Sequence, residues 1–282
     1  MGYSKKKLML LVDGMPAFPP SVYRILKLTA DINCAPKDLV RIIDLDPVLT
    51  LKLLQLVNSP YFGLSRQIGS IKQAVVFVGI NTIKNLALTI APLEITRNSE
   101  FSPFMDNLRA HAIAVAVIAK HLARRIGVSD LDSTDFFVAG LLHDFGKMAL
   151  FRLNPNDYFK ALRMAAKKNI PLHRAERSVF GVDHTDIGAI LGDKWCLPAE
   201  FVACMERHHA WDPANTSAMQ DCVFVANIIA KIIGVGQSGN PVVENTLPKE
   251  ISERLGIQLQ ELIGSLGDLS GDMNKAQIYI HP

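Results

Sequence analysis

The chain has 282 residues, of which 49% are apolar, so it is long enough to bury a sizeable core in one large or two modest domains. Charged residues make up only 20% and the formal net charge is +3, which argues against nucleic acid or an anionic membrane as the main partner. The four cysteines form no CxxC pair, as expected of reduced thiols in a cytoplasmic protein. No segment reads as a signal peptide or approaches the ~18 apolar residues of a membrane span.

Helix signals dominate the first third of the chain. Asp46-Pro47 places a capping carboxylate before a proline at the first helical position, and apolar residues follow at helical spacing. Similar starts near residues 21, 36, 70 and 81 predict five short helices over 20–91, closed by Pro92. The stretch 74–78 also suits a strand by its β-branched content, but its length and short connections favour a helix.

A polar break at 96–102 separates a second set of helices. Pro103 is expected to start a helix that stops at Gly127, and Ser133 is expected to cap another that runs to about Phe151. Further helices are expected near 156–169, 171–180, 184–195, 198–209 and 219–233. A final amphipathic part follows the Gly/Ser/Asn/Pro-rich stretch after Gly234, and it either caps the bundle or pairs with another copy.

These patterns predict an all-α protein in two helical halves, because neither an internal repeat nor a strand–helix alternation is visible. The expected parts are a lead over 1–14, an N-terminal helical subdomain over 15–98, a helical bundle over 99–236, and a linker with a helical tail over 237–282.

Histidine and aspartate are concentrated in the second half. His143 and Asp144 are adjacent in an apolar segment predicted to be helical, where a buried carboxylate without a cation is costly. Other helices are expected to carry His111, His184 and the pair His208-His209. Imidazole and carboxylate together suit a divalent ion such as Zn, Mn, Fe, Ni or Mg. A single histidine is better explained as a hydrogen-bonded core or surface group, and three are interpreted as surface residues: His121, His173 and His281.

A series of motifs then carries a family resemblance. In the first half they are MPAFPP at 15–20, IDLDP at 43–47, NSPYFG at 58–63 and IKQAVVFVG at 71–79. In the second half they are AGLLHDFGK at 139–147, HTDIG at 184–188, WCLP at 195–198 and HH at 208–209. Residues about 15–235 thereby resemble the HDOD family, a branch of the HD superfamily of metal-dependent phosphohydrolases that is related to the HD-GYP proteins.

The resemblance implies an N-terminal helical subdomain packed on an HD-type bundle, and a bacterial signalling or regulatory role. By analogy with active HD enzymes, His111, His143 and Asp144 match metal-ligand positions. Three more residues match the extra ligands of two-metal HD-GYP cyclic-di-GMP phosphodiesterases: His184, His208 and His209. Lys147 matches a lysine that approaches substrate phosphate.

Two departures from the family's active members stand out. Asn227 lies where an active HD domain has its final metal-binding aspartate, and a neutral amide oxygen is a weaker ligand than a carboxylate. Asp221 is six residues upstream, about 120° off that helix face, and is a poor substitute. Ala-Trp-Asp-Pro follows His208-His209 in place of a Gly-Tyr-Pro signature, which weakens a claim to cyclic-di-GMP hydrolysis.

The turn at 58–63 has two interpretations. Asn58 can end a helix while Pro60 and Gly63 shape a structural corner, or the polar and aromatic residues can form a binding site; the corner is favoured. Asp44 and Asp46 are interpreted as caps.

Three functions remain open at this stage. The favoured one is a regulatory or scaffolding protein with a degenerate metal site that binds a protein partner in a signalling pathway. The alternative is an active phosphohydrolase acting on a nucleotide or other phosphate ester, with Asp144 and Lys147 as catalytic residues beside the metal. The third is a nucleotide sensor without turnover.

Overall fold

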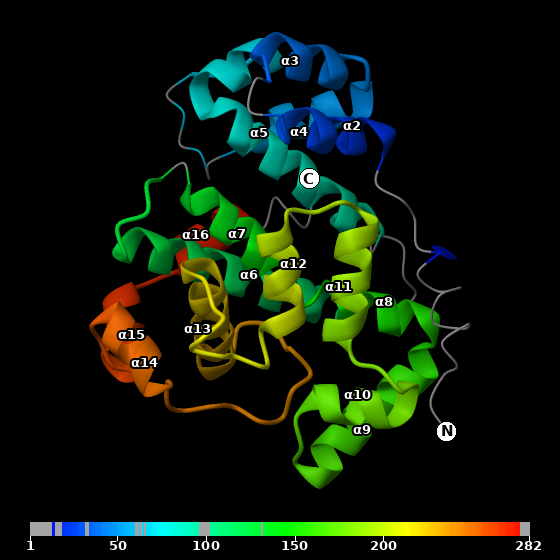
Figure 1. The fold of residues 1–282 in the computed structure, drawn as a ribbon, viewed down its shortest axis with the longest axis vertical. Helices are drawn as coiled ribbons and strands as arrows, with labels where there is room; N and C mark the ends of the chain where they lie inside the picture. The colour runs from blue at the N-terminus through cyan, green and yellow to red at the C-terminus, as the bar shows by residue number, and fades with distance from the viewer. Residues whose placement is uncertain are drawn as a thin grey trace.

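A computed structural model describes residues 13–14, 19–31, 34–59, 62, 64, 66–95, 102–130 and 132–276. The described residues form helices joined by short connections, with no strand among them, so the predicted all-α class is confirmed. Helices α2 to α5 gather at one end of the molecule, and the longer helices form a bundle beneath them (Figure 1).

The N-terminal group contains α2 (Pro20–Thr29), α3 (Pro36–Asp44), α4 (Pro47–Val57) and the first part of α5 (Ile71–Ile95). The predicted cap on α4 is present, because the Asp46 side chain accepts a hydrogen bond from the Leu49 backbone N–H. The same carboxylate also accepts from the Ser21 hydroxyl at 2.6 Å, which ties α2 to α4.

Asn58 ends α4, and its side chain forms the corner expected from the sequence. Its side-chain amide donates to the carbonyls of Leu54 and Ile68 and accepts from the Ile68 N–H. Pro60, Tyr61 and Gly63 lie outside the described residues, so the proposed roles of the two turn residues stay predictions.

Helix α5 differs from its expected form in two ways. The two expected helices make one element that is interrupted at Gly79, where φ is 81° and ψ is 163°, a conformation open to glycine. The element continues past Pro92 to Ile95, because a proline near a helix end forfeits only one backbone hydrogen bond. Residues Ile71–Ile90 are long and apolar enough to cross a membrane, contrary to the sequence-based expectation. However, 61% of that window is buried and Gly79 breaks it, as in the core helix of a globular domain.

The bundle begins with α6 (Ser102–Arg125) and α7 (Ser133–Leu142), which pack along each other, and α13 (Ala218–Ile233) packs on α6 as well. Five further helices lie between α7 and α13 in sequence: α8 (Phe145–Leu153), α9 (Pro155–Lys168), α10 (Leu172–Phe180), α11 (His184–Lys194) and α12 (Ala199–Arg207). Ser133 is the first residue of α7 and does not cap it, since its hydroxyl donates to the Asp130 carbonyl.

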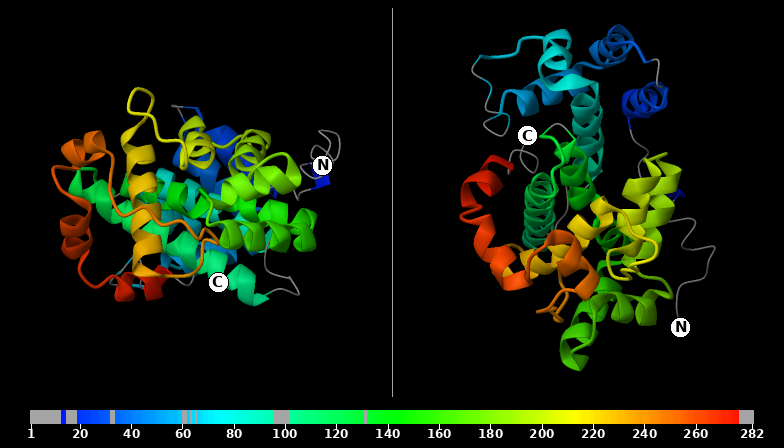
Figure 2. Two further views of the ribbon diagram at one scale, coloured as in Figure 1. Left: turned by 90° about the horizontal axis from the view of Figure 1, so that it is seen from below. Right: turned by 60° about the vertical axis from the view of Figure 1, so that its left-hand side comes forward.

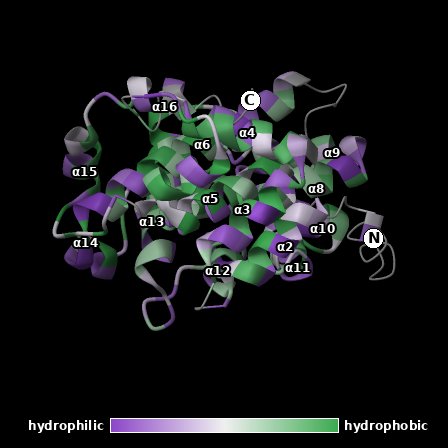
Figure 3. Cartoon of the chain, turned by 90° about the horizontal axis from the view of Figure 1, so that it is seen from above, coloured by the Kyte–Doolittle hydropathy of each residue, from purple (hydrophilic) through white to green (hydrophobic). Residues whose placement is uncertain are grey.

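The N-terminal group and the bundle meet where α5 packs against α7. At this contact the buried Asn85 side chain donates a hydrogen bond to Asp135. Figure 2 shows α5 running from the N-terminal group toward the bundle. In Figure 3 the hydrophobic residues follow the inner helices α5 and α6, while hydrophilic residues cover the outlying α14 and α15. The core is therefore continuous through both parts.

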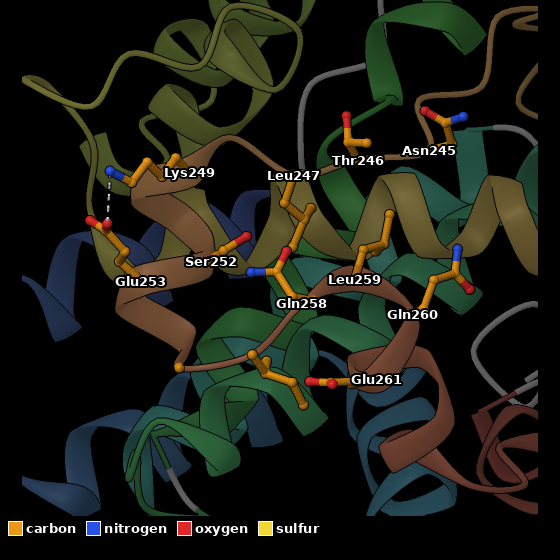
Figure 4. A pocket seen from close by; sticks show the side chains of 12 residues that line it. Asn245, Thr246, Leu247, Lys249, Ser252, Glu253, Gln258, Leu259, Gln260 and Glu261 are labelled. Atoms are coloured by element: carbon orange, nitrogen blue, oxygen red, sulfur yellow. Dashed lines mark ion pairs between the residues drawn. The ribbon is translucent and has the colours of Figure 1, made fainter.

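The C-terminal part contains α14 (Lys249–Leu255), α15 (Leu259–Leu266) and α16 (Ser270–Ala276). Helix α16 packs against α6, and Asp272 lies 2.8 Å from the His121 ring, so within this chain the tail caps the bundle. A hollow of about 660 Å³ lies between α14 and α15, and the Lys249–Glu253 pair borders it (Figure 4). It is lined by residues 245–261 and is separate from the histidines.

Candidate metal centre

His143 and Asp144 lie at the junction between α7 and α8, so the prediction that they sit inside one continuous helix is wrong. Asp144 has φ −99° and ψ 10°, and the Lys147 N–H donates to the Asp144 carbonyl as α8 begins. Close packing accompanies this break, because Gly146 of α8 approaches the backbone of His184 so nearly that a Cβ would lie 1.9 Å from its carbonyl oxygen. The change of direction brings the Asp144 carboxylate beside α11.

The other predicted site residues come from four further helices or their ends. His111 lies within α6, His184 is the first residue of α11, and Asn227 lies within α13. His208 is the C-terminal cap of α12, and His209 follows it. The fold brings these residues together with His143 and Asp144, although they span more than a hundred positions of sequence.

One group of side chains consists of His111, His143 and Asp144. The Asp144 Oδ2 atom lies 3.2 Å from His143 Nε2 and 3.7 Å from His111 Nε2. The second group consists of Asp144, His184, His208 and His209. There the Asp144 Oδ1 atom lies 3.3 Å from His208 Nε2 and 3.4 Å from His184 Nε2. The ligand atoms within each group all lie within 4.8 Å of one another, and Asp144 belongs to both.

The outward hydrogen bonds of three rings set their tautomers. The Nδ1–H groups of His143, His184 and His208 donate to backbone carbonyls or to a carboxylate, none of which can donate in return. In the neutral ring, Nε2 then carries a lone pair that points inward. His184 Nε2 nevertheless lies 3.2 Å from His208 Nε2 and 3.0 Å from His209 Nε2. The lone pairs of His184 and His208 repel at this distance unless a positive charge lies between them, so the donor set fits a divalent cation.

The electrostatics of the site agree with this donor set. Burial lowers the pKa of His111 and of His208 to about 3, and it lowers the pKa of His209 well below its usual value. Burial alone would raise the pKa of Asp144, but His143 and Lys147 outweigh it and hold that pKa well below its ordinary range. At neutral pH Asp144 is therefore ionised and the imidazoles of His111, His208 and His209 are neutral, which are the forms that bind metals.

The two halves of the site are not equivalent. In the first, His111 Nε2 lies 3.1 Å from the Asn227 amide oxygen, an uncharged partner. Asp221 does not replace the missing acid, because its carboxylate accepts hydrogen bonds from Trp211, Thr216 and Arg254 instead. The second half has three imidazoles and the shared carboxylate.

Lys147 is buried beside Asp144. Its ammonium group donates to Asp144 Oδ2 at 2.6 Å and to the Ser238 carbonyl at 2.9 Å. Ser238 belongs to residues 234–241, here called the strap, which lies along the end of the site. Gly236 of the strap packs so closely on α6 that a Cβ added there would lie 2.3 Å from the backbone nitrogen of His111.

Two residues near the site escaped the sequence analysis. Glu176 of α10 is fully buried and accepts a hydrogen bond from His184 Nδ1 at 2.5 Å. His173, interpreted as a surface residue, is half-buried and stacks on the His209 ring at 4.8 Å. Only the one-turn spacing of these two residues on α10 hinted at a shared face. His281 lies outside the described residues.

Both the sequence and the fold of this chain are similar to those of known proteins. The family model described as the HDOD domain matches residues 15–211. An uncharacterized protein of Treponema pallidum (strain Nichols) is 28% identical over 198 residues, which are 70% of this chain and 38% of that protein. The chain therefore spans well under half the length of this relative.

Two solved structures share the fold. An HDOD domain protein of unknown function from Geobacter sulfurreducens is 24% identical with a TM-score of 0.75, covering 98% of both chains. A Shewanella amazonensis SB2B protein, whose name proposes a phosphohydrolase, is 22% identical with a TM-score of 0.73, covering 97% of this chain and 98% of that one. Since the family model matches more than half of the sequence, the chain belongs to the HDOD domain family.

Proposed function

We propose that this chain is a regulatory protein that holds one divalent metal ion in its buried histidine cluster and acts by binding a protein partner in a signalling pathway. Asp144, His184, His208 and His209 would hold the ion, with Zn, Mn, Fe, Ni and Mg as the candidates. His111, His143 and Asn227 form the weaker half. A bound ion of this kind can act as a Lewis acid and can lower the pKa of a coordinated water.

The closure of the site carries this proposal. The side chains of His143 and His184 are fully buried, and the Lys147 side chain is only 2% exposed. The Lys147 ammonium group donates to Asp144 and to the Ser238 carbonyl. A phosphate oxygen that binds Lys147 would have to take the place of the Ser238 carbonyl. An ion fits among these groups, whereas a phosphate ester would first have to displace the strap.

A second observation favours a partner. The N-terminal group exposes large apolar side chains on α4 and α5 and beside them: Leu45 is 71% exposed, Val48 62%, Leu51 59% and Val76 76%. Exposed apolar side chains gathered on one part of a protein favour protein–protein contact over bare solvent. We therefore assign partner binding to residues 15–98 and metal binding to residues 99–236. We also propose that the protein is cytoplasmic.

The test compares metal retention with turnover. Wild-type protein reconstituted with each candidate metal is incubated with a broad panel of phosphomonoesters and phosphodiesters. The proposal expects bound metal and no hydrolysis above that of an Asp144→Asn variant. A Val76→Asp variant should keep its fold and its metal but lose the partner that wild-type protein retains. Turnover that disappears in Asp144→Asn would contradict a regulatory role.

An active phosphohydrolase is the second candidate, because five imidazoles remain around Asp144. In that case Asp144 would orient a water or accept its proton, and Lys147 would leave Ser238 to neutralise the developing charge of the phosphate. Metal-replete protein without activity on the panel would exclude this candidate. Calorimetry against cyclic dinucleotides on the same samples tests the third function, a nucleotide sensor: it would bind the dinucleotide without hydrolysing it.

A further inference from the structure

Glu176 is a buried acid with an unusual pair of partners. It lies on α10 with no exposed surface. Its Oε2 atom accepts from the His184 ring at Nδ1 and also from the His184 backbone N–H at 3.0 Å. One carboxylate oxygen thus fixes both the start of α11 and the rotation of its first side chain.

Capping of α11 needs Glu176 only at the His184 N–H. The Asp183 side chain already accepts from the backbone N–H groups of Thr185 and Asp186, and the Asp186 side chain completes the capping box. Arg177 donates to Asp183 and holds it from the solvent side. The first turn of α11 is therefore largely satisfied without Glu176.

The burial of the Glu176 carboxylate requires an explanation besides helix capping. Within the described residues, the ion-pair partner of Glu176 is the His184 ring. Its close neighbour Tyr158 is uncharged, since burial and then the Glu176 charge raise the pKa of the Tyr158 hydroxyl well above its usual value. A fully buried carboxylate is costly unless positive charge lies nearby. A divalent ion on the far side of the His184 ring would supply that charge.

We propose that Glu176 is the positioning residue of the metal centre, which holds His184 with Nε2 toward Asp144, His208 and His209 and makes that half the tighter one. This inference rests on the proposed metal binding. A carboxylate that accepts from the outer nitrogen of a ligating imidazole fixes its tautomer and orientation and raises its basicity as a ligand. Glu176 does not touch the ion itself.

The test measures Zn²⁺ affinity by competition with a chromophoric chelator. Glu176→Gln should bind Zn²⁺ about 10- to 100-fold more weakly than wild type. Glu176→Asp keeps the charge on a shorter side chain and should bind with intermediate affinity. Asp183→Asn is the matched control, because it removes the ion pair between Asp183 and Arg177 at the start of α11 but leaves the ring contact of His184 intact. Its affinity should stay within about threefold of wild type.

A measurement on unaltered protein covers the case in which a variant fails to fold. In a ¹⁵N spectrum of histidine-labelled wild type with Zn²⁺, His184 should show a protonated Nδ1 and a metal-shifted Nε2. Glu176→Gln binding Zn²⁺ as tightly as wild type, Asp183→Asn weakening it equally, or a protonated Nε2 in the spectrum would each overturn the positioning role. Wild type that binds no Zn²⁺ or other candidate ion would instead overturn the proposed function on which the role rests.

Discussion

Gly146→Ala should break the contact that brings Asp144 to His184. An added Cβ would lie 1.9 Å from the His184 carbonyl oxygen and 2.9 Å from the Gly188 nitrogen, both backbone atoms that cannot rotate away. Helices α8 and α11 would have to separate, and overpacking of this kind costs typically 1–3 kcal/mol and occasionally more. The higher helix propensity of alanine returns up to about 1 kcal/mol. Because the overlap is with two backbone atoms, we take the upper end of that cost and expect a net loss of roughly 2 kcal/mol in the free energy of unfolding.

Gly188→Ala is the matched control from the opposite side of the same contact. Its added Cβ would meet only Met205 side-chain atoms at 3.5 Å and the Gly146 nitrogen at 3.9 Å, which are ordinary contacts. This variant should be unchanged or more stable by up to about 1 kcal/mol. Urea unfolding of metal-free protein, followed by circular dichroism, measures both. Equal stability of the two variants would refute the backbone contact at Gly146 as the element that sets the site's geometry.

Three other predictions concern the site and its cover. Asn227→Asp adds a carboxylate 3.1 Å from His111 and should raise the metal content from about one to two ions per chain; an unchanged content would contradict the weakness assigned to that half. Burial lowers the pKa of His111 and His208 from 6.5 to about 3, so the unfolded chain binds protons first as the pH falls. Metal-free protein should therefore lose roughly 2 kcal/mol per histidine between pH 7 and pH 5 in urea unfolding, and a flat profile would count against neutral buried imidazoles. Gly236→Ala should push the strap off α6 and speed Zn²⁺ release to a chelator, whereas Gly234→Ala, equally strained but with nothing within 4 Å, should not; equal rates would mean that the strap does not cover the site.

The helices were predictable from sequence where local chemistry decides them. Asp46 caps α4, and α9 to α13 lie within two residues of their expected limits, because proline, capping side chains and 3.6-residue periodicity act over a single turn. The break at Asp144 was not predictable, since the apolar pattern runs unbroken from α7 into α8. Its position depends on the packing of Gly146 against His184, which is a long-range contact.

The candidate metal site was also predictable only in part. The family resemblance pointed to the histidines and Asp144, and the fold brings them within reach of one another. Glu176 was missed because an acid on an amphipathic helix ordinarily faces solvent, whereas the packing of α10 on α9 and α11 buries it. His173 was missed for a related reason, since its contact with His209 joins two elements far apart in sequence.

The most direct test of the account is the metal content of untagged protein by plasma mass spectrometry, after supply of Mn, Fe, Ni and Zn. A His184→Gln/His208→Gln variant of the tighter half serves as the comparison, with its fold checked by circular dichroism. If the buried histidine cluster holds one metal ion, wild-type protein should carry about one ion per chain and the variant should lose it. A well-folded wild type without metal, or a variant that retains the full amount, would contradict it.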